Sequence, residues 1–241
     1  MGSSVSTTSR RGSLLLSYSA DVRSLVTTSS RFEGSTLYMF GGMVNEDRYS
    51  DLYAFNTATN HWTRLPNGPM VGRGGAGLVV CGDTAECARL LVIGGHVGHG
   101  VSDVWEYTIA AKRWQAREEL NLPVPCSIFA CGVIADHPKA VDSTICVFGG
   151  ELNHTTNDAV AGQYSHDTLL LRSCAEPGEC TVRVLPSSEA YVPPARGWTS
   201  GCVLKPEAAG TSVFAMFGGV REGSGPEPAG VRLGDLAIFE Y

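Results

Sequence analysis

The stretch LYMFGGMVNEDRYSDLYAFNTATNHW, residues 37–62, decides the fold because its pattern recurs along the chain. An apolar run ends in two glycines, a polar loop follows, and an aspartate then leads a short apolar strand. In that strand Phe55 stands seven residues before Trp62, and the turn sequence NTATNH separates them. Two strand-like runs around a short polar turn predict a β-hairpin.

Three further copies of this unit follow. The first glycines of successive pairs are 53, 55 and 69 residues apart, and each pair precedes an aspartate-led apolar strand. Repeats of roughly this period indicate a solenoid or a propeller. The glycines are Gly41, Gly42, Gly94, Gly95, Gly149, Gly150, Gly218 and Gly219, and the aspartates are Asp51, Asp103, Asp167 and Asp235.

Each unit is expected to contain four short strands, here called a to d. Strand a begins after an Arg-Gly pair in two copies, at Arg73 and Arg196. Strand b ends at the glycine pair, strand c follows the aspartate, and strand d holds a tryptophan in the first two copies. In the second copy Tyr107 and Trp114 repeat the spacing of the first. Alternating turns and short strands of this kind predict an all-β fold.

Taken together, the ordered glycine pairs, aromatic residues and tryptophans resemble kelch repeats. The resemblance covers residues 12–241 and implies an all-β, kelch-type β-propeller with four repeats of four-stranded antiparallel blades. We expect a flexible leader at residues 1–11 and repeats at about 20–68, 69–121, 122–187 and 188–241. Because the last copy ends after strand c, residues 12–19, with the run SLLLSY at 13–18, are expected to complete the last blade. The alternative is that the four repeats are part of a larger propeller or a longer protein.

The motif residues have structural roles in such a fold. Glycine permits backbone angles and close approaches that a side chain would prevent. Trp62 and Trp114, each with its aromatic partner, are expected to be buried between neighbouring blades. The third copy departs from the pattern, because Leu171 and Val182 replace the aromatic residue and the tryptophan, and its strand a has no arginine.

Composition supports an all-β protein and excludes some functions. The 241 residues include 29 glycines, and only 17% are charged, which favours tight turns and buried strands. A net charge of −6 without a basic cluster argues against nucleic-acid binding. No apolar run is long enough to span a bilayer, and we expect a cytoplasmic protein.

The sequence allows two interpretations of the cysteine pairs and two of the first residues. Cys81 with Cys87, and Cys174 with Cys180, have the spacing C-x5-C at expected hairpin tips and are either disulfides or free thiols. The start MGSSVS matches the N-myristoylation pattern at Gly2, against a plain disordered leader. One acyl chain would add only weak membrane association.

Function is expected to lie on one face of the propeller, where b–c and d–a loops meet. Loops on a rigid scaffold commonly carry binding residues, and arginines suit acidic groups of a protein partner. We expect a non-enzymatic interaction scaffold without a cofactor, because no catalytic motif is evident. The candidate partner-binding residues are Arg48, Arg73, His96, His99, His154, Arg196 and Arg221.

Two other functions stay open. Histidines and carboxylates of the same loops, with Glu46, Asp47, Glu151 and Asp158 among them, could hold a metal in an enzyme. The Glu-x3-Asp-x3-His run of iron-binding kelch proteins is absent from the chain, which weakens that reading. The chain could also be the regulatory kelch part of a larger protein.

Overall fold

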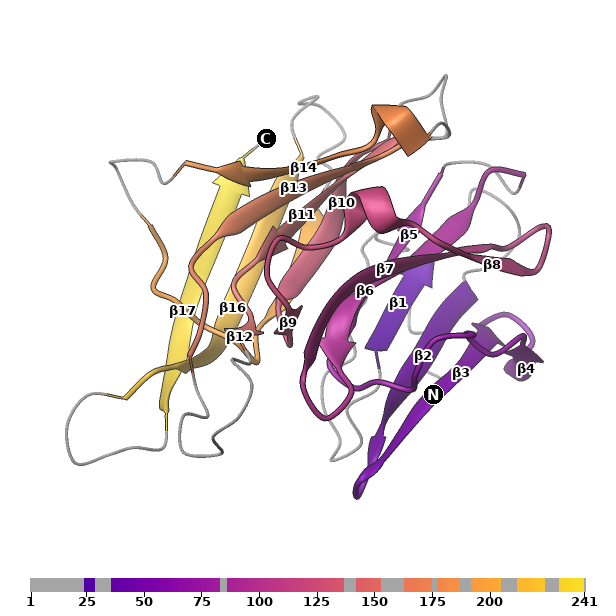
Figure 1. Cartoon of the computed structure of the whole chain (residues 1–241), viewed down its shortest axis with the longest axis horizontal. Coiled ribbons are helices and arrows are strands. Elements are labelled where there is room, and N and C mark those ends of the chain that lie inside the picture. The colour runs from indigo at the N-terminus through magenta and orange to yellow at the C-terminus, as the bar shows by residue number, and fades with distance from the viewer. Residues whose placement is uncertain are drawn as a thin grey trace, which may run out of the picture.

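A computed structural model describes residues 24–28, 36–82, 86–136, 142–152, 163–174, 177–186, 192–204, 212–223 and 230–240. These residues form four larger antiparallel sheets in chain order, as the four sequence copies predict, and one separate two-stranded sheet. Figure 1 shows the sheets fanned across the molecule, with the first and last at opposite sides. Each of the four larger sheets corresponds to one blade.

The first two blades have four strands each. Blade 1 contains β1 (Ser24–Thr28), β2 (Thr36–Val44), β3 (Asp47–Asn56) and β4 (His61–Leu65). Blade 2 contains β5 (Gly77–Cys81), β6 (Arg89–His96), β7 (Gly100–Thr108) and β8 (Arg113–Ala116). A 3-10 turn, η1 (Glu118–Leu120), leads toward blade 3.

Blade 3 has four strands, and the described part of blade 4 has three. Blade 3 contains β10 (Ala130–Asp136), β11 (Ser143–Phe148), β13 (Thr168–Ser173) and β14 (Thr181–Leu185), with η3 (Pro177–Glu179) in its c–d turn. Beside it, β9 (Cys126–Ser127) pairs with β12 (Glu151–Leu152). Blade 4 contains β15 (Ser200–Leu204), β16 (Val213–Arg221) and β17 (Val231–Glu240).

The paired glycines bend strand b where it approaches the next blade. All eight have positive φ, and in three blades the register shifts beside the first glycine of the pair. A Cβ on Gly149 would lie 2.5 Å from the Arg196 carbonyl oxygen, so a side chain does not fit. The glycines therefore allow the backbone of the following a strand to lie directly against strand b.

Apolar clusters join consecutive blades. Phe40, Leu52 and Tyr107 belong to the cluster between blades 1 and 2, where Trp114 also packs with its ring 5.8 Å from that of Phe40. Further clusters join blades 2 and 3 through residues such as Ile145, and blades 3 and 4 through Phe148, Phe214 and Met216. Each pair of consecutive blades thus shares a hydrophobic cluster of its own.

Trp62 is more exposed than the sequence predicts. Its side chain packs on Phe55, with ring centroids 4.8 Å apart, but the residue is 45% exposed. Trp114 is covered because blade 1 lies against its side of blade 2. Trp62 occupies the matching place on blade 1, and no described residue of another blade covers it.

The expected closure of the last blade falls outside the described residues. The run at 13–18 is not among them, so its pairing with β17 stays a prediction. Within the described part, one face of blade 4 carries apolar residues that no neighbour covers: Leu204, Phe217, Leu236 and Ile238 are 50–61% exposed. The opposite face of that sheet packs on blade 3.

Candidate functional site

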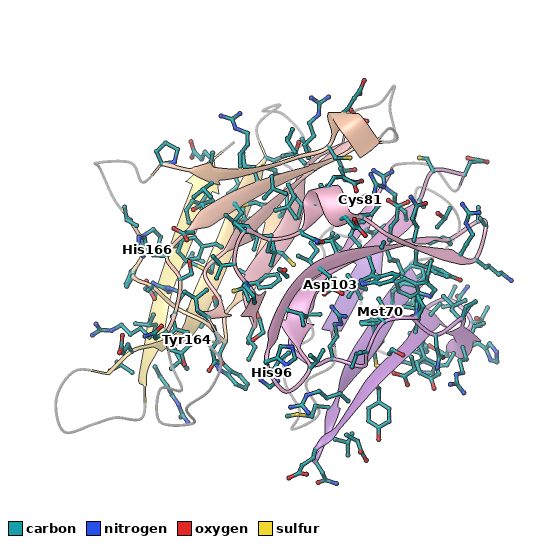
Figure 2. The ribbon with its side chains drawn as sticks, viewed as in Figure 1. Met70, Cys81, His96, Asp103, Tyr164 and His166 are labelled. Atoms are coloured by element: carbon teal, nitrogen blue, oxygen red, sulfur yellow. The ribbon has the colours of Figure 1, made fainter. Side chains whose placement is uncertain are left out.

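The described residues at the b–c ends of blades 1, 2 and 3 lie along one side of the molecule. Figure 2 shows His96 and Tyr164, from blades 2 and 3, on the lower side of the view, where the β2–β3 hairpin also ends. This hairpin turns at Asn45 and Glu46, and Asn45 has the positive φ that such tight turns need. Short turns on paired strands give these loops a rigid base.

Arg48 and His96 are brought together across the boundary of blades 1 and 2. Nη2 of Arg48 lies 3.3 Å from Nδ1 of His96, and Nη1 donates to the Glu46 carbonyl at 3.1 Å. His96 is held in place because its backbone forms two hydrogen bonds with Gly74. The predicted residues Arg48 and His96 thus form one cluster from two blades.

The Arg48–His96 contact requires a neutral imidazole. Nδ1 of His96 accepts hydrogen bonds from Arg48 and from the Gly98 amide, so the ring proton resides on Nε2. Burial, the Arg48 charge and the nearby His99 lower the pKa of His96 below its ordinary value. His99 is exposed at the tip of the same loop.

Arg73 and Arg196, in contrast, are not on the surface. Their side chains are 2% and 0% exposed. Arg73 binds both carboxylate oxygens of Asp103, at 2.6 and 3.0 Å, and Arg196 binds both of Asp235, at 2.7 and 2.8 Å. The expectation that these two arginines contact a partner is therefore corrected: each is enclosed and paired within its own blade.

The remaining predicted residues are dispersed. Arg221 is exposed at the end of β16, on a different blade from Arg48. Glu46 and Asp47 are exposed in the β2–β3 hairpin. His154, Asp158 and Gly2 lie outside the described residues.

Glu151, which the sequence offered only as a possible metal ligand, forms a polar and aromatic group with Tyr164 of blade 3 and Trp198 of blade 4, two residues that the sequence did not single out. Glu151 pairs by backbone with Tyr164 and accepts a hydrogen bond from the Trp198 side chain. Burial raises the pKa of Glu151, and burial together with Glu151 raises that of Tyr164. Trp198 is 38% exposed, and its φ is 52°. The sequence signal that could have pointed to this group is the position of Trp198 directly after the Arg-Gly pair that begins strand a.

The described histidines do not gather into a metal site. Among the described residues, one group of three, Asp142, Cys174 and Glu179, brings its ligand atoms within 4.8 Å of one another. It lies at the c–d end of blade 3, away from the b–c loops, and Arg172 already binds Asp142 at 3.0 Å. Burial raises the pKa of the Cys174 thiol to about 11, which favours the protonated form.

None of the eight cysteines, all of which lie in the described residues, forms a disulfide in the structure. Cys180 accepts a hydrogen bond from the Cys174 amide at 3.2 Å and lies 3.0 Å from Nη2 of Arg117. The C-x5-C pairs are therefore thiols here, in line with the reading of reduced cysteines. None of the helices in the described residues has the length and apolar character that crossing a bilayer requires.

Comparison with known proteins agrees with the fold. Residues 34–69, which span most of blade 1, match the family model described as the kelch motif. The chain aligns with a solved structure entitled "Structure of YjhT" with a TM-score of 0.60 and 13% sequence identity. The alignment covers 90% of this chain and 68% of the other chain. At that identity the likeness concerns the fold alone.

Curated relatives include three host cell factors. The chain is 28% identical to human host cell factor 1 over 208 residues, 27% identical to human host cell factor 2 over 203 residues, and 24% identical to the host cell factor of Drosophila melanogaster over 205 residues. The alignments cover 83–85% of this chain but only 9%, 24% and 13% of those relatives. With the repeated glycine bulges and the four blades, these matches support a kelch-type β-propeller fold.

Proposed function

We propose that this chain is a non-enzymatic protein-interaction scaffold that binds its partner through the face formed by the b–c and d–a loops. The observation that carries the proposal is the Arg48–His96 cluster, in which two neighbouring blades present polar groups at one place. A partner with acidic groups suits this surface, because a guanidinium binds carboxylates in a defined planar geometry.

Arg48 keeps hydrogen-bonding capacity for such a partner. Of its five N–H donors, the structure accounts for one to His96 and one to Glu46, and Nε is buried without a partner among the described residues, so the second N–H groups of Nη1 and Nη2 are the ones left for a partner. Because His96 is neutral, it does not repel a cation beside it, yet it supplies no charge to neutralise the arginine. The cluster therefore retains a positive charge that a carboxylate can meet.

The strands that carry the loops are fixed to one another by hydrogen bonds and ion pairs. The Gly42 amide donates to the Arg73 carbonyl at 2.9 Å, and the Gly150 amide donates to the Arg196 carbonyl at 2.7 Å. Each buried arginine then fixes the aspartate that begins strand c. A preorganised surface loses less entropy on binding, which favours recognition by loops.

The relatives support an interaction role but leave its setting to be proposed. The chain spans between 9% and 24% of the length of the host cell factors compared here. We therefore also propose that it serves as the kelch part of a larger assembly. N-myristoylation at Gly2 and a cytoplasmic location stay predictions.

Charge reversal tests the proposal directly. We expect Arg48→Glu with Arg221→Glu to weaken partner binding by roughly tenfold or more, because each change turns an attraction for acidic groups into a repulsion. Partners are first recovered with the intact protein by affinity purification and mass spectrometry. The affinity for the purified partner is then measured by calorimetry.

The matched control reverses two arginines away from this face. Arg113→Glu with Arg183→Glu makes the same change in net charge on exposed residues of β8 and β14. This control should bind as the unaltered protein does. Equal affinity for the Arg48/Arg221 variant and the control would refute the proposed face.

A further inference from the structure

The buried arginines of blades 2 and 4 share one binding pattern. In blade 2, Arg73 donates from Nε to the Val71 carbonyl and from Nη1 to the Gly94 carbonyl at 3.1 Å, besides its two bonds to Asp103. The guanidinium thus binds three acceptor residues from three segments of the chain: the residue two positions earlier, the first glycine of the pair, and the aspartate of strand c.

Blade 4 repeats this arrangement. Arg196 donates from Nε to the Pro194 carbonyl at 3.1 Å, from Nη1 to the Gly218 carbonyl at 3.0 Å, and to both oxygens of Asp235. The recurrence shows that the fold builds a specific place for a planar, five-donor cation in a blade of this kind.

In blade 3 the position of the arginine is taken by Cys126. The strand registers establish the equivalence, because Gly77, Ala130 and Ser200 pair with the residue before the glycine pair in their blades, and Arg73, Cys126 and Arg196 stand four positions before them. The carbonyl of each also faces the first glycine of the preceding blade, at 2.5–2.7 Å from where a Cβ would be.

The acceptors remain in blade 3 although the arginine is missing. A cavity of about 20 Å³ is lined by Val124, Gly149 and Asp167, which are the three counterparts of the acceptor residues in blades 2 and 4. Leu122 and Leu169 form part of its apolar wall. This volume holds about one water-sized group, so one amino group of a guanidinium fits inside it. The rest of the guanidinium would lie beside the exposed carboxylate of Asp167.

The electrostatics of the cavity favour a cation. Burial, Glu151 and Asp167 raise the pKa of the Cys126 thiol to about 12, although a bond from Ser127 opposes them, so the thiol is neutral. Its sulfur lies 3.4 Å from the Gly149 carbonyl oxygen. No side chain among the described residues donates a hydrogen bond to the Asp167 carboxylate. The cavity is thus lined by Asp167 and by Gly149, whose carbonyl oxygen lies beside Cys126, while its described lining residues include no lysine, arginine or histidine.

We propose that this cavity of blade 3 is a guanidinium-binding slot that receives an arginine side chain of a protein partner. The arginine would bind as Arg73 and Arg196 do, with its amino groups toward the Gly149 carbonyl and the Asp167 carboxylate. This inference rests on the proposed function only in assigning the arginine to a partner. It adds a cation-accepting site to the surface that presents Arg48.

The intact chain with small probes tests the slot. We expect methylguanidinium and N-acetyl-arginine-N-methylamide to cause saturable NMR shifts at the amides of Cys126, Gly149 and Asp167. Methylammonium and the corresponding lysine amide should bind roughly tenfold more weakly, because a point charge cannot bridge the three acceptors. Binding of methylguanidinium without binding of the arginine amide would refute a protein arginine as the occupant.

Variants assign the shifts to the slot. Cys126→Arg should abolish binding, since an internal guanidinium fills the space, and Asp167→Asn should weaken it by roughly tenfold. Cys202→Ser, at a cysteine that does not line the cavity, is the control and should bind as the unaltered chain does. Unchanged binding by Asp167→Asn, or no preference for methylguanidinium over methylammonium, would overturn the inference.

The two proposals fail separately. Arg48→Glu with Arg221→Glu should leave methylguanidinium binding unchanged, because neither residue lines the cavity. If that variant loses the partner while the slot binds no probe, the interaction face stands and the slot does not.

Discussion

The ion pair of Arg196 with Asp235 is asymmetric, and this asymmetry decides what each residue contributes. The arginine side chain is fully buried, whereas that of the aspartate is 38% exposed. Removing the carboxylate leaves a buried cation with carbonyl groups alone, which is far more costly than leaving a solvated carboxylate. Such a pair fixes a conformation more than it adds to stability.

Loss of the Asp235 carboxylate should therefore be more harmful than loss of its counterpart in blade 3. We expect Asp235→Asn to lower the free energy of unfolding by roughly 3 kcal/mol, because Arg196 loses its counter-charge. Asp167→Asn is the matched control, and it should cost less than about 0.5 kcal/mol because no described arginine depends on it. Urea unfolding at neutral pH measures both. Equal losses would contradict the equivalence of the two sites.

The stability that the Asp235 carboxylate contributes should depend on pH. Hydrogen bonds from Arg196 and its charge, against a smaller effect of desolvation, hold the pKa of Asp235 below its ordinary value. A carboxyl with a depressed pKa in the folded state stabilises fully above its unfolded pKa of about 3.9, and this contribution is lost as pH falls through the folded value. The stability difference between the unaltered protein and Asp235→Asn should narrow below about pH 4, in unfolding curves recorded from pH 3 to 6. A constant difference would exclude this linkage.

At the scale of the strand, the glycine pair is the element that sets how closely blades approach. Gly149 has a φ of 72°, and its Cβ position lies 2.5 Å from the Arg196 carbonyl oxygen. Both the backbone angle and the contact oppose any side chain. The following a strand can lie there only because the position is glycine.

Replacing a glycine of this pair should destabilise the protein, whereas replacing a glycine with open space around it should not. We expect Gly149→Ala to lower the free energy of unfolding by at least about 2 kcal/mol, since it combines an unfavourable φ with a backbone clash. Gly178→Ala is the control, because nothing lies within 4 Å of its Cβ position, and it should change stability by less than about 0.5 kcal/mol. Thermal and urea unfolding both report the effect. A tolerated Gly149→Ala would show that the blades can separate slightly without cost.

At the scale of the whole molecule, the two end blades carry apolar surface that the inner blades bury. Trp62 on blade 1 and Phe217, Leu236 and Ile238 on blade 4 are 45–61% exposed. In blades 2 and 3, both faces of the sheet pack on a neighbour. In a closed propeller a neighbouring blade would cover these residues as well.

Matched truncations test whether the N-terminal segment completes blade 4, as we propose. Removal of residues 1–11 should leave the unfolding midpoint unchanged. Removal of residues 1–19 should lower the free energy of unfolding by at least about 2 kcal/mol, because β17 would lose its outer neighbour. Unfolding of the two shortened chains is compared by circular dichroism. Identical midpoints would assign the closing strand elsewhere.

Some features of this protein follow from its sequence alone. The spacing of the glycine pairs and of the aspartates predicts four blades, and the substitutions at Leu171 and Val182 predict their pairing in blade 3. These features depend on local periodicity and on the backbone angles of glycine, which adjacent residues determine. The missing arginine of the third copy was also visible, although its consequence was not.

The tertiary structure alone decided which polar residues are available for binding. In the sequence Arg73, Arg196 and Arg48 were all candidates for partner binding, but the first two are enclosed by their blades and the third contacts His96 across a blade boundary. The cavity at Cys126 likewise exists only because strands distant in the sequence bring their acceptors to one place. Burial and contact depend on which sheet lies beside which, and no local pattern contains that information.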